Sequence, residues 1–269
     1  MKAGTPALVG ARHPLLRRFR EAWRRGELTE DGCCAVEGLH LVEEAFRSPV
    51  EVVALLAARS AEERLGRFEA AANGRVRSYV TSDRLFRSLA PTETPQGIAA
   101  LLRLREQPLE ECLARANALV AVLMGVQDPG NLGTVLRSLE AFGGAACLLG
   151  PDTVSPFNPK AVRASAGSLF RVPVYRRLRL EEIFGACKRH GVQTVALAAD
   201  GGRRLSDVNL TGAAAFLVGR EGSGLPGAVL SRADIVARVP MTAGVESLNA
   251  AVAASLALYE AARQRGFAG

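Results

Sequence analysis

The sequence predicts an α/β fold whose C-terminal part is a doubly wound parallel sheet, and three observations carry this prediction. Short apolar runs, typical of buried parallel strands, alternate with helical segments through the second half of the chain. Three Gly-rich turns follow strand ends, which is where such sheets bind their ligands. Hydrophobic residues make up 48% of the 269 residues but aromatic residues only 5%, so we expect cores of Ala, Val and Leu.

The chain begins with a basic stretch that we assign to a helical arm, residues 1–31. Residues 1–25 contain seven Lys or Arg and one acid, Glu21. The apolar residues of this stretch recur at helical spacing: Leu15, Leu16, Phe19 and Trp23. This pattern favours an amphipathic helix with a basic face over a solvated or frayed terminus.

Residues 32–104 alternate between helix and strand patterns, which predicts a small α/β sandwich. The expected elements, in order, are an entry into a helix at Ala35 to Gly38, the helix Leu39 to Phe46, a strand Val50 to Ala57, a helix around Ala61 to Ala72, a strand Val76 to Val80, a short helix after Ser82 and a strand Ile98 to Leu102. Residues 105–118 are polar and partly helical, and they form the expected linker.

Residues 119–269 form the second predicted domain. Its expected strands are continuous apolar runs: Leu119 to Met124, Ala145 to Leu149, Val192 to Ala198, Ala214 to Val218 and Ile235 to Val239. Its expected helices are Leu132 to Phe142, Lys160 to Gly167, Leu180 to His190 and Ala250 to Arg265. The last helix is rich in small residues, so another surface must pack closely against it.

The first Gly-rich turn runs from Gln127 to Gly133. Asn131 stands where a helix N-cap would stand, and capping is one interpretation of it. Arg137 follows within the same helix among apolar neighbours, so it needs an acidic partner such as Glu140 or a bound anion.

The second turn, Gly219 to Leu225, holds three glycines that let the backbone approach a ligand or another chain closely. It is not a nucleotide P-loop, and the chain contains no G-x-G-x-x-G dinucleotide motif. Glu221 can be a general base, a ribose ligand or an ordinary turn residue.

The third turn, Met241 to Asn249, leads into the last helix. Ser247 can cap that helix. Alternatively, Ser247 and Asn249 can hold a flat heterocycle around Leu248, which would supply apolar packing.

The composition excludes several classes of protein. The chain has three histidines, none of them in the turns, and no Cys/His cluster suited to a metal, so neither a metal site nor Ser-His-Asp catalysis is expected. Five scattered cysteines fit free thiols in a reducing compartment. No apolar run is long enough for a membrane span and no signal peptide is evident, so we expect a cytoplasmic protein. A net charge of +7 favours a polyanionic partner.

The three turns together resemble the motifs of the SpoU (TrmH-type) RNA ribose 2′-O-methyltransferases of the SPOUT superfamily. Asp128 to Gly133 with Arg137 is similar to the first motif, Leu217 to Leu225 to the second, and Val239 to Asn249 to the third. Pro156 to Gly167 resembles a further family stretch. The resemblance extends to Val36-Glu37-Gly38 and Thr94 to Gly97, which look like an N-terminal substrate-binding domain related to kink-turn-binding ribosomal proteins.

This resemblance implies a C-terminal trefoil knot, a homodimer with the active site near its interface, and S-adenosylmethionine as methyl donor. It implies cofactor contacts at Gly219, Val239 and Leu248, with Ala198 and Ala199 as weaker candidates. The implied catalytic set is Asn131, Arg137, Glu221, Ser247 and Asn249. Because a guanidinium keeps its proton in proteins, we expect Arg137 to bind a phosphate and stabilise the oxyanion rather than act as a base.

The expected RNA footprint combines the basic arm, the small domain and an arginine cluster near residue 175. Its candidate residues are Arg12, Arg17, Arg18, Arg171, Arg176 and Arg177. The extra N-terminal domain favours ribosomal RNA of the large subunit (23S) as substrate. A transfer-RNA enzyme, a resistance-type ribosomal RNA methyltransferase and a non-catalytic RNA-binding protein are the alternatives, and a dinucleotide-binding enzyme is disfavoured.

Overall fold

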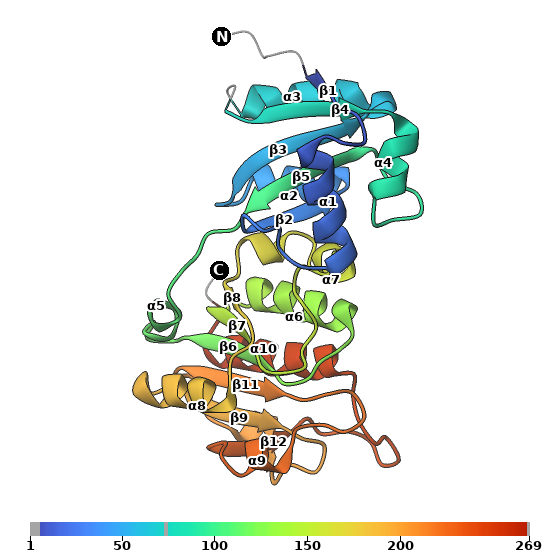
Figure 1. The fold of residues 1–269 in the computed structure, drawn as a ribbon. Coiled ribbons are helices and arrows are strands. Elements are labelled where there is room, and N and C mark those ends of the chain that lie inside the picture. Colours follow the sequence, from blue (N-terminus) through green and yellow to red (C-terminus); the bar gives the residue numbers. More distant parts are fainter. Residues whose placement is uncertain (1–5, 73–74, 268–269) are drawn as a thin grey trace. The chain divides into compact units, whose positions relative to one another are not determined.

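The computed structural model describes residues 6–72 and 75–267, which fold as two compact units (Figure 1). The first unit runs up to Arg105 and also includes Ser155–Arg171, and the second comprises Glu106–Val154 and Val172–Gly269. The predicted arm therefore belongs to the first unit, as does a segment that we had expected in the second domain. Residues 1–5, with Lys2 of the arm, lie outside the described residues.

The first unit contains a mixed sheet with the strand order β1-β4-β3-β5-β2. Its strands are β1 (Ala7–Leu8), β2 (Cys33–Glu37), β3 (Glu51–Ala58), β4 (Arg77–Thr81) and β5 (Ile98–Arg103). β5 runs antiparallel to both β2 and β3, whereas β3 and β4 are parallel. The expectation that Ala35 to Gly38 forms the entry into a helix was wrong for Ala35 to Glu37. These residues belong to β2, which pairs along its whole length with β5.

Helices cover both faces of this sheet. α1 (Pro14–Arg25) and α4 (Asp83–Leu89) pack against one face, where the α1 residues Leu16 and Phe19 are fully buried. α2 (Leu39–Phe46), the 3-10 helix η1 (Arg59–Arg64) and α3 (Leu65–Ala71) follow along the chain, and the stacked rings of Phe46 and Phe68 join α2 to α3. The predicted amphipathic helix is confirmed as α1, which ends at Gly26 in the left-handed conformation that favours glycine.

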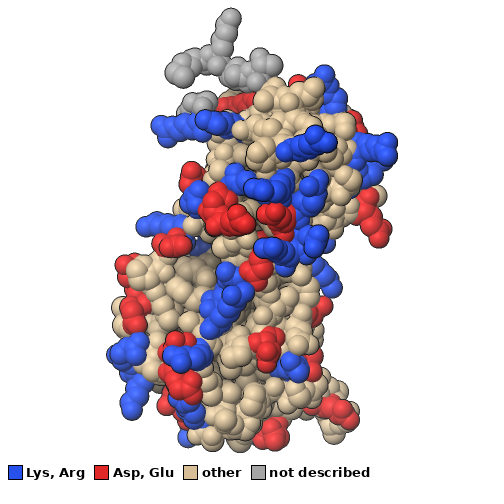
Figure 2. Space-filling view, viewed as in Figure 1, with Lys and Arg blue, Asp and Glu red and all other residues tan. Residues whose placement is uncertain are grey.

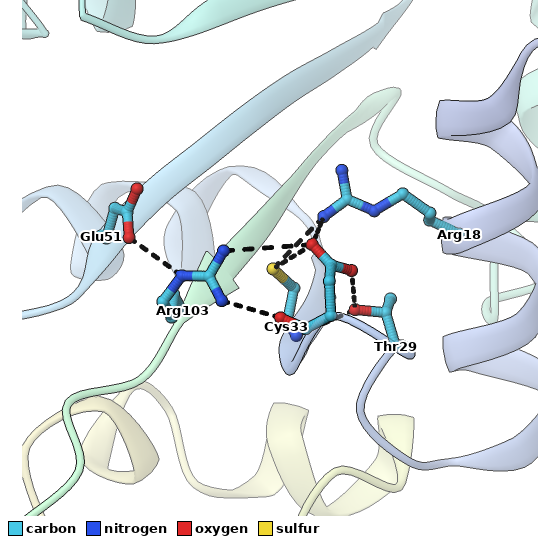
Figure 3. Close-up of polar contacts among 6 residues, drawn as sticks. Arg18, Thr29, Cys33, Glu51 and Arg103 are labelled. Atoms are coloured by element: carbon cyan, nitrogen blue, oxygen red, sulfur yellow. Dashed lines mark hydrogen bonds and ion pairs between the residues drawn. The ribbon is translucent and has the colours of Figure 1, made fainter.

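A polar cluster ties α1 to the edge of the sheet (Figure 3). Its members are Arg18, Thr29, Asp31, Cys33, Glu51 and Arg103. Asp31 accepts hydrogen bonds from Arg18 and Thr29, at 2.5 and 2.7 Å. Burial tends to raise the pKa of Asp31, but the Thr29 hydrogen bond and the Arg18 charge outweigh it and leave this pKa lowered. The carboxylate therefore stays ionised and holds Arg18 in place.

The segment Ser155–Arg171 contains α7 (Pro159–Ala164) and the 3-10 helix η2 (Ser168–Phe170), and it packs against α2. Arg171 donates hydrogen bonds to Glu44 at 3.0 Å and to the Ser48 hydroxyl at 2.7 Å. Gly167 has a φ of +94°, and a Cβ there would lie 2.8 Å from the Glu44 side chain. Only glycine fits this close approach.

The second unit is built on a parallel sheet with the strand order β10-β12-β9-β11-β6-β7-β8. Its strands are β6 (Leu119–Leu123), β7 (Ala146–Leu149), β8 (Val174–Tyr175), β9 (Gln193–Leu197), β10 (Arg203–Arg204), β11 (Ala214–Val218) and β12 (Ile235–Arg238). Every pairing between them is parallel. The predicted α/β class with a parallel C-terminal sheet is confirmed.

Helices lie on both faces of the second sheet. The helices are α5 (Leu109–Leu113), α6 (Pro129–Ala141), α8 (Leu180–Arg189), α9 (Gly227–Leu230) and α10 (Ala250–Gln264), with the 3-10 helix η3 (Leu205–Asp207) before β11. α6 and α10 pack side by side on β6 and β11, while α5 and α8 join a second apolar layer on the other face. This double covering explains why the central strands are apolar throughout.

Further sequence expectations concern cysteines, membranes and metals. All five cysteines are buried free thiols, as expected. In the part of the chain that the structure describes, no helix is long and apolar enough to cross a membrane. Within the same residues, no group of three or more His, Cys, Asp or Glu side chains is placed to hold a metal ion.

Candidate active site

A cavity of about 470 Å³ opens at the carboxyl ends of β9, β11 and β12, within the second unit. All five predicted cofactor positions line it: Ala198, Ala199, Gly219, Val239 and Leu248. Two predicted catalytic residues, Glu221 and Ser247, line it as well. The structure thus brings the second and third Gly-rich turns together around one space, at the edge of the sheet where ligands of such folds bind.

Gly219 is required by the backbone that passes beside it. A Cβ at this position would lie 2.2 Å from the carbonyl of Gly224 and 2.4 Å from the nitrogen of Leu225. Gly201, after β9, is similarly close to the backbone of Ala237 in β12, at 2.5 Å. These approaches leave no room for a side chain at either position, so the cavity wall at Gly219 is bare backbone.

A chain of hydrogen bonds joins all three turns beside the cavity. The side-chain amide of Asn131 donates to the Glu221 carboxylate at 2.5 Å. The side-chain amide of Asn249 donates to the side-chain oxygen of Asn131 at 2.9 Å. Asn131 therefore acts as donor on one side and acceptor on the other. Three of the five predicted catalytic residues form this network, although they are up to 118 positions apart in the sequence.

The helix caps differ from those the sequence suggested. Asp128 caps α6 by accepting a hydrogen bond from the Asn131 backbone nitrogen at 2.9 Å, so Asn131 lies in the first turn and its side chain is available to the network. Asn249 caps α10 through the backbone nitrogens of Ala251 and Val252. Ser247 precedes this cap and is exposed, and the suggestion that it caps the helix was wrong.

Arg137 lies apart from the cavity of its own chain. Its neighbours Leu136 and Leu139 are buried, but Arg137 itself is exposed on α6. Within the described residues Arg137 forms neither a hydrogen bond nor an ion pair, so it does not form the suggested salt bridge with Glu140. The structure therefore leaves its charge open to an anion.

Sequence reasoning did not single out two acidic residues at the cavity wall, Asp200 and Glu246. Asp200 follows the end of β9 and Glu246 precedes Ser247, and both are exposed. The available signal was position, because a polar residue just after the carboxyl end of a parallel strand faces the ligand edge of the sheet.

The candidate RNA-binding arginines divide into two groups. Arg12, just before α1, and Arg17, on α1, are both exposed. Arg18 and Arg171 are held by Asp31 and Glu44, with 27% and 28% of their side chains exposed. The remaining two candidates, Arg176 and Arg177, follow β8 in the second unit.

Comparisons with known proteins match both units. Residues 118–259 match the family model described as "SpoU rRNA Methylase family", and residues 16–100 match "MRM3-like substrate binding domain". The 23S rRNA (guanosine(2553)-2′-O)-methyltransferase RlmP of Bacillus subtilis is 34% identical over 94% of this chain and 97% of its own. An uncharacterized tRNA/rRNA methyltransferase of Mycobacterium tuberculosis is 34% identical over 97% of this chain and 83% of its own.

Two solved structures are similar over nearly the whole chain. An AdoMet-bound rRNA methyltransferase from Sinorhizobium meliloti aligns with a TM-score of 0.83 and 26% identity, covering 97% of this chain and 98% of that one. The methyltransferase AviRb from Streptomyces viridochromogenes, in complex with AdoMet, aligns with a TM-score of 0.79 and 25% identity, covering 94% and 98%.

Proposed function

Because the chain belongs to the SpoU rRNA methylase family, we propose that it transfers a methyl group from S-adenosylmethionine to a ribose 2′-hydroxyl of 23S ribosomal RNA. The observation that carries the proposal is the Asn131, Glu221 and Asn249 network beside the cavity. The Bacillus subtilis relative is named for this reaction on 23S rRNA and matches along 97% of its length, which supports the choice of substrate.

The cavity suits S-adenosylmethionine. Its volume of about 470 Å³ lies in the range of roughly 300–1,000 Å³ that small-molecule sites occupy. Leu197, Leu225 and Leu248 offer apolar packing, and the bare backbone at Gly219 offers polar groups at close range. Asp200 and Glu246 bring negative charge that favours a cationic ligand. When bound, this ligand supplies a methyl group carried on a sulfonium, whose sulfur is a good leaving group.

The protein's own task is to position the acceptor hydroxyl. Asn131 and Asn249 fix the Glu221 carboxylate at the cavity rim, so that Glu221 can accept a hydrogen bond from a ribose hydroxyl. Ser247 is exposed at the same wall and has no role in capping, which leaves its hydroxyl for the substrate. These roles remain our proposal.

We propose that the chain acts as a homodimer through α10. Val252, Leu256 and Tyr259 are 44, 39 and 44% exposed and recur at helical spacing, so they form one apolar stripe. An exposed stripe of this kind marks an interaction surface. The trefoil knot and a cytoplasmic location are further proposals, which rest on the family and, for the location, on the five buried thiols.

Arg137 fits the proposed reaction best in such a dimer. It lies on α6, which packs beside α10, where Ser138 and Ser255 share a hydrogen bond of 2.6 Å. We propose that its unpaired guanidinium serves the site of the partner chain, where it binds the RNA phosphate and stabilises charge that develops on the ribose oxygen.

Methyl transfer to unmodified 23S rRNA transcribed in vitro, followed by mapping of 2′-O-methyl positions, tests the proposal. We expect Arg137→Ala to abolish transfer while calorimetry shows nearly unchanged affinity for S-adenosylmethionine. Arg189→Ala, an exposed arginine at the end of α8, is the matched control and should remain active. Normal turnover of the Arg137 variant would refute its role, and absence of methylation by the native protein would refute the function.

A further inference from the structure

The outer face of α1 and α4 in the first unit carries arginines that the proposed function does not yet use. On α1, Arg17, Arg20 and Arg24 are exposed and recur at i, i+3 and i+7, so they form one stripe along the helix. On α4, Arg84 and Arg87 are exposed at i and i+3. We call these five residues the basic helix face.

The two helices form one continuous surface. They contact each other and pack on the same apolar cluster, which includes Leu16 and Phe19 of α1 and Phe86 and Leu89 of α4. With their apolar sides buried together, both helices turn their arginines outward. Figure 2 shows blue side chains gathered over the region where Figure 1 places α1 and α4.

Little of this charge is neutralised within the protein. Arg20, Arg24 and Arg84 have no hydrogen bond or ion pair within the described residues. Arg17 has only a loose ion pair with Glu21 at 3.9 Å. A solvated helix face usually interleaves both signs of charge, whereas this one is predominantly positive. It therefore attracts a polyanion.

Two of the arginines predicted from the sequence are unsuited to the same task. Arg18 lies on α1 but is held by Asp31 and Cys33, and Arg171 is held by Glu44 and Ser48. Freeing either guanidinium for a phosphate would break these contacts. The basic helix face offers charge without that cost.

The surface lacks exposed Phe, Tyr and Trp rings, on which unpaired bases commonly stack. No Phe, Tyr or Trp side chain of the first unit is exposed within its described residues, and Phe19, Trp23 and Phe86 of these two helices are buried. Proteins that recognise single strands commonly stack the bases on such rings. Arginines on a firm helical support instead suit the phosphates of a base-paired stem.

We infer that the basic helix face binds the phosphate backbone of a double-stranded RNA stem and thereby holds the substrate for methyl transfer. The inference rests on the proposed function, because it names the part of the first unit that contacts the RNA. It also explains how the unit that matches a substrate-binding family can bind without aromatic platforms.

Two double variants test the inference in the full-length protein: Arg20→Ala with Arg24→Ala, and Arg84→Ala with Arg87→Ala. The probes are a stem-loop RNA and an oligouridylate of the same length, with affinity measured over a series of salt concentrations. Native protein should prefer the stem-loop. Each double variant should bind it about tenfold more weakly, with a salt slope lower by about 1.5, because each lost phosphate contact removes roughly 0.7–0.9.

The matched control removes two arginines from the other helical layer, Arg47→Ala with Arg67→Ala. Both are paired with glutamates in the native fold, Arg47 with Glu44 and Arg67 with Glu43. We expect stem-loop affinity in this control to stay within about twofold of native. Circular dichroism melting confirms that each variant is folded, and calorimetry should show native affinity for S-adenosylmethionine in all of them.

The outcomes separate this inference from the proposed function. If the native protein methylates RNA but the basic-face variants bind the stem-loop as tightly as the control does, the inference fails and the function stands. A native preference for oligouridylate would also overturn the inference. If the native protein methylates no RNA, the proposed function fails, even where stem-loop binding depends on these arginines.

Discussion

At the scale of single residues, Asn131 connects the three turns, because its side chain is both donor and acceptor. It donates to Glu221 and accepts from Asn249. In an Asn131→Asp variant, the new carboxylate can still accept from Asn249 but repels the Glu221 carboxylate. We expect turnover to fall about 100-fold, which is the typical cost of misplacing a reacting group by about 1 Å.

The Glu221→Gln background isolates this effect. There, the carboxylate of the Asn131→Asp variant can accept a hydrogen bond from the new glutamine amide, so the second substitution should cost little further activity. Turnover and melting temperature of both single variants and the double variant form the cycle that measures the coupling. Thr134→Ala, on the exposed side of α6, is the control. An equal loss from Asn131→Asp in both backgrounds would show that the network is not what positions Glu221.

The N-caps of α6 and α10 show which features of the site could be predicted from local sequence patterns and which could not. Pro129 pointed to Asp128 as the cap of α6, since proline is favoured at the first helical position. Asn131 drew attention instead because asparagine is itself a good cap. No local pattern could show that Asn131 meets Asn249, because this contact exists only once α6 and α10 are packed together.

At the scale of elements, sequence patterns served best where a segment is long or buried on both faces. The helix Leu39–Phe46 and the strand Ala214–Val218 have the predicted bounds, and most other elements differ by one or two residues at their ends. The two-residue strands β1, β8 and β10 escaped prediction, because so short a pairing has no periodicity of its own. β2 was missed because Ala35 to Gly38 was interpreted as the entry into the helix that follows it.

The apolar stripe of α10 makes the proposed homodimer testable. Leu256→Asp places a charge at the centre of the stripe, where an interface would have to desolvate it. We expect this variant to elute as a monomer in size-exclusion chromatography with light scattering, and to lose methyl transfer. Arg263→Ala, an exposed position on the same helix, should leave the oligomer intact. A Leu256→Asp variant that remains dimeric would place the interface elsewhere.

At the scale of the whole molecule, the first unit is completed by residues from much later in the chain. Ser155–Arg171 packs against α2, more than a hundred positions earlier, through contacts such as Arg171 with Glu44. The sequence placed this segment in the second domain, because it follows a strand of that domain and no local pattern marks such an exchange. The stability of the first unit therefore depends on a segment that belongs in sequence to the second.

This dependence predicts that a change at Arg171 acts on α2. Arg171→Ala removes a cationic partner of the Glu44 carboxylate, which is only 15% exposed and also pairs with Arg47. We expect the free energy of unfolding to fall by about 1–3 kcal/mol, the usual range for a charged hydrogen bond. Hydrogen exchange read by mass spectrometry should show faster exchange in Leu39–Phe46. Arg179→Ala breaks a surface pair whose arginine is 75% exposed, so it should change neither quantity measurably. Unaltered protection of α2 in the Arg171 variant would mean that the two segments of the first unit are stable independently.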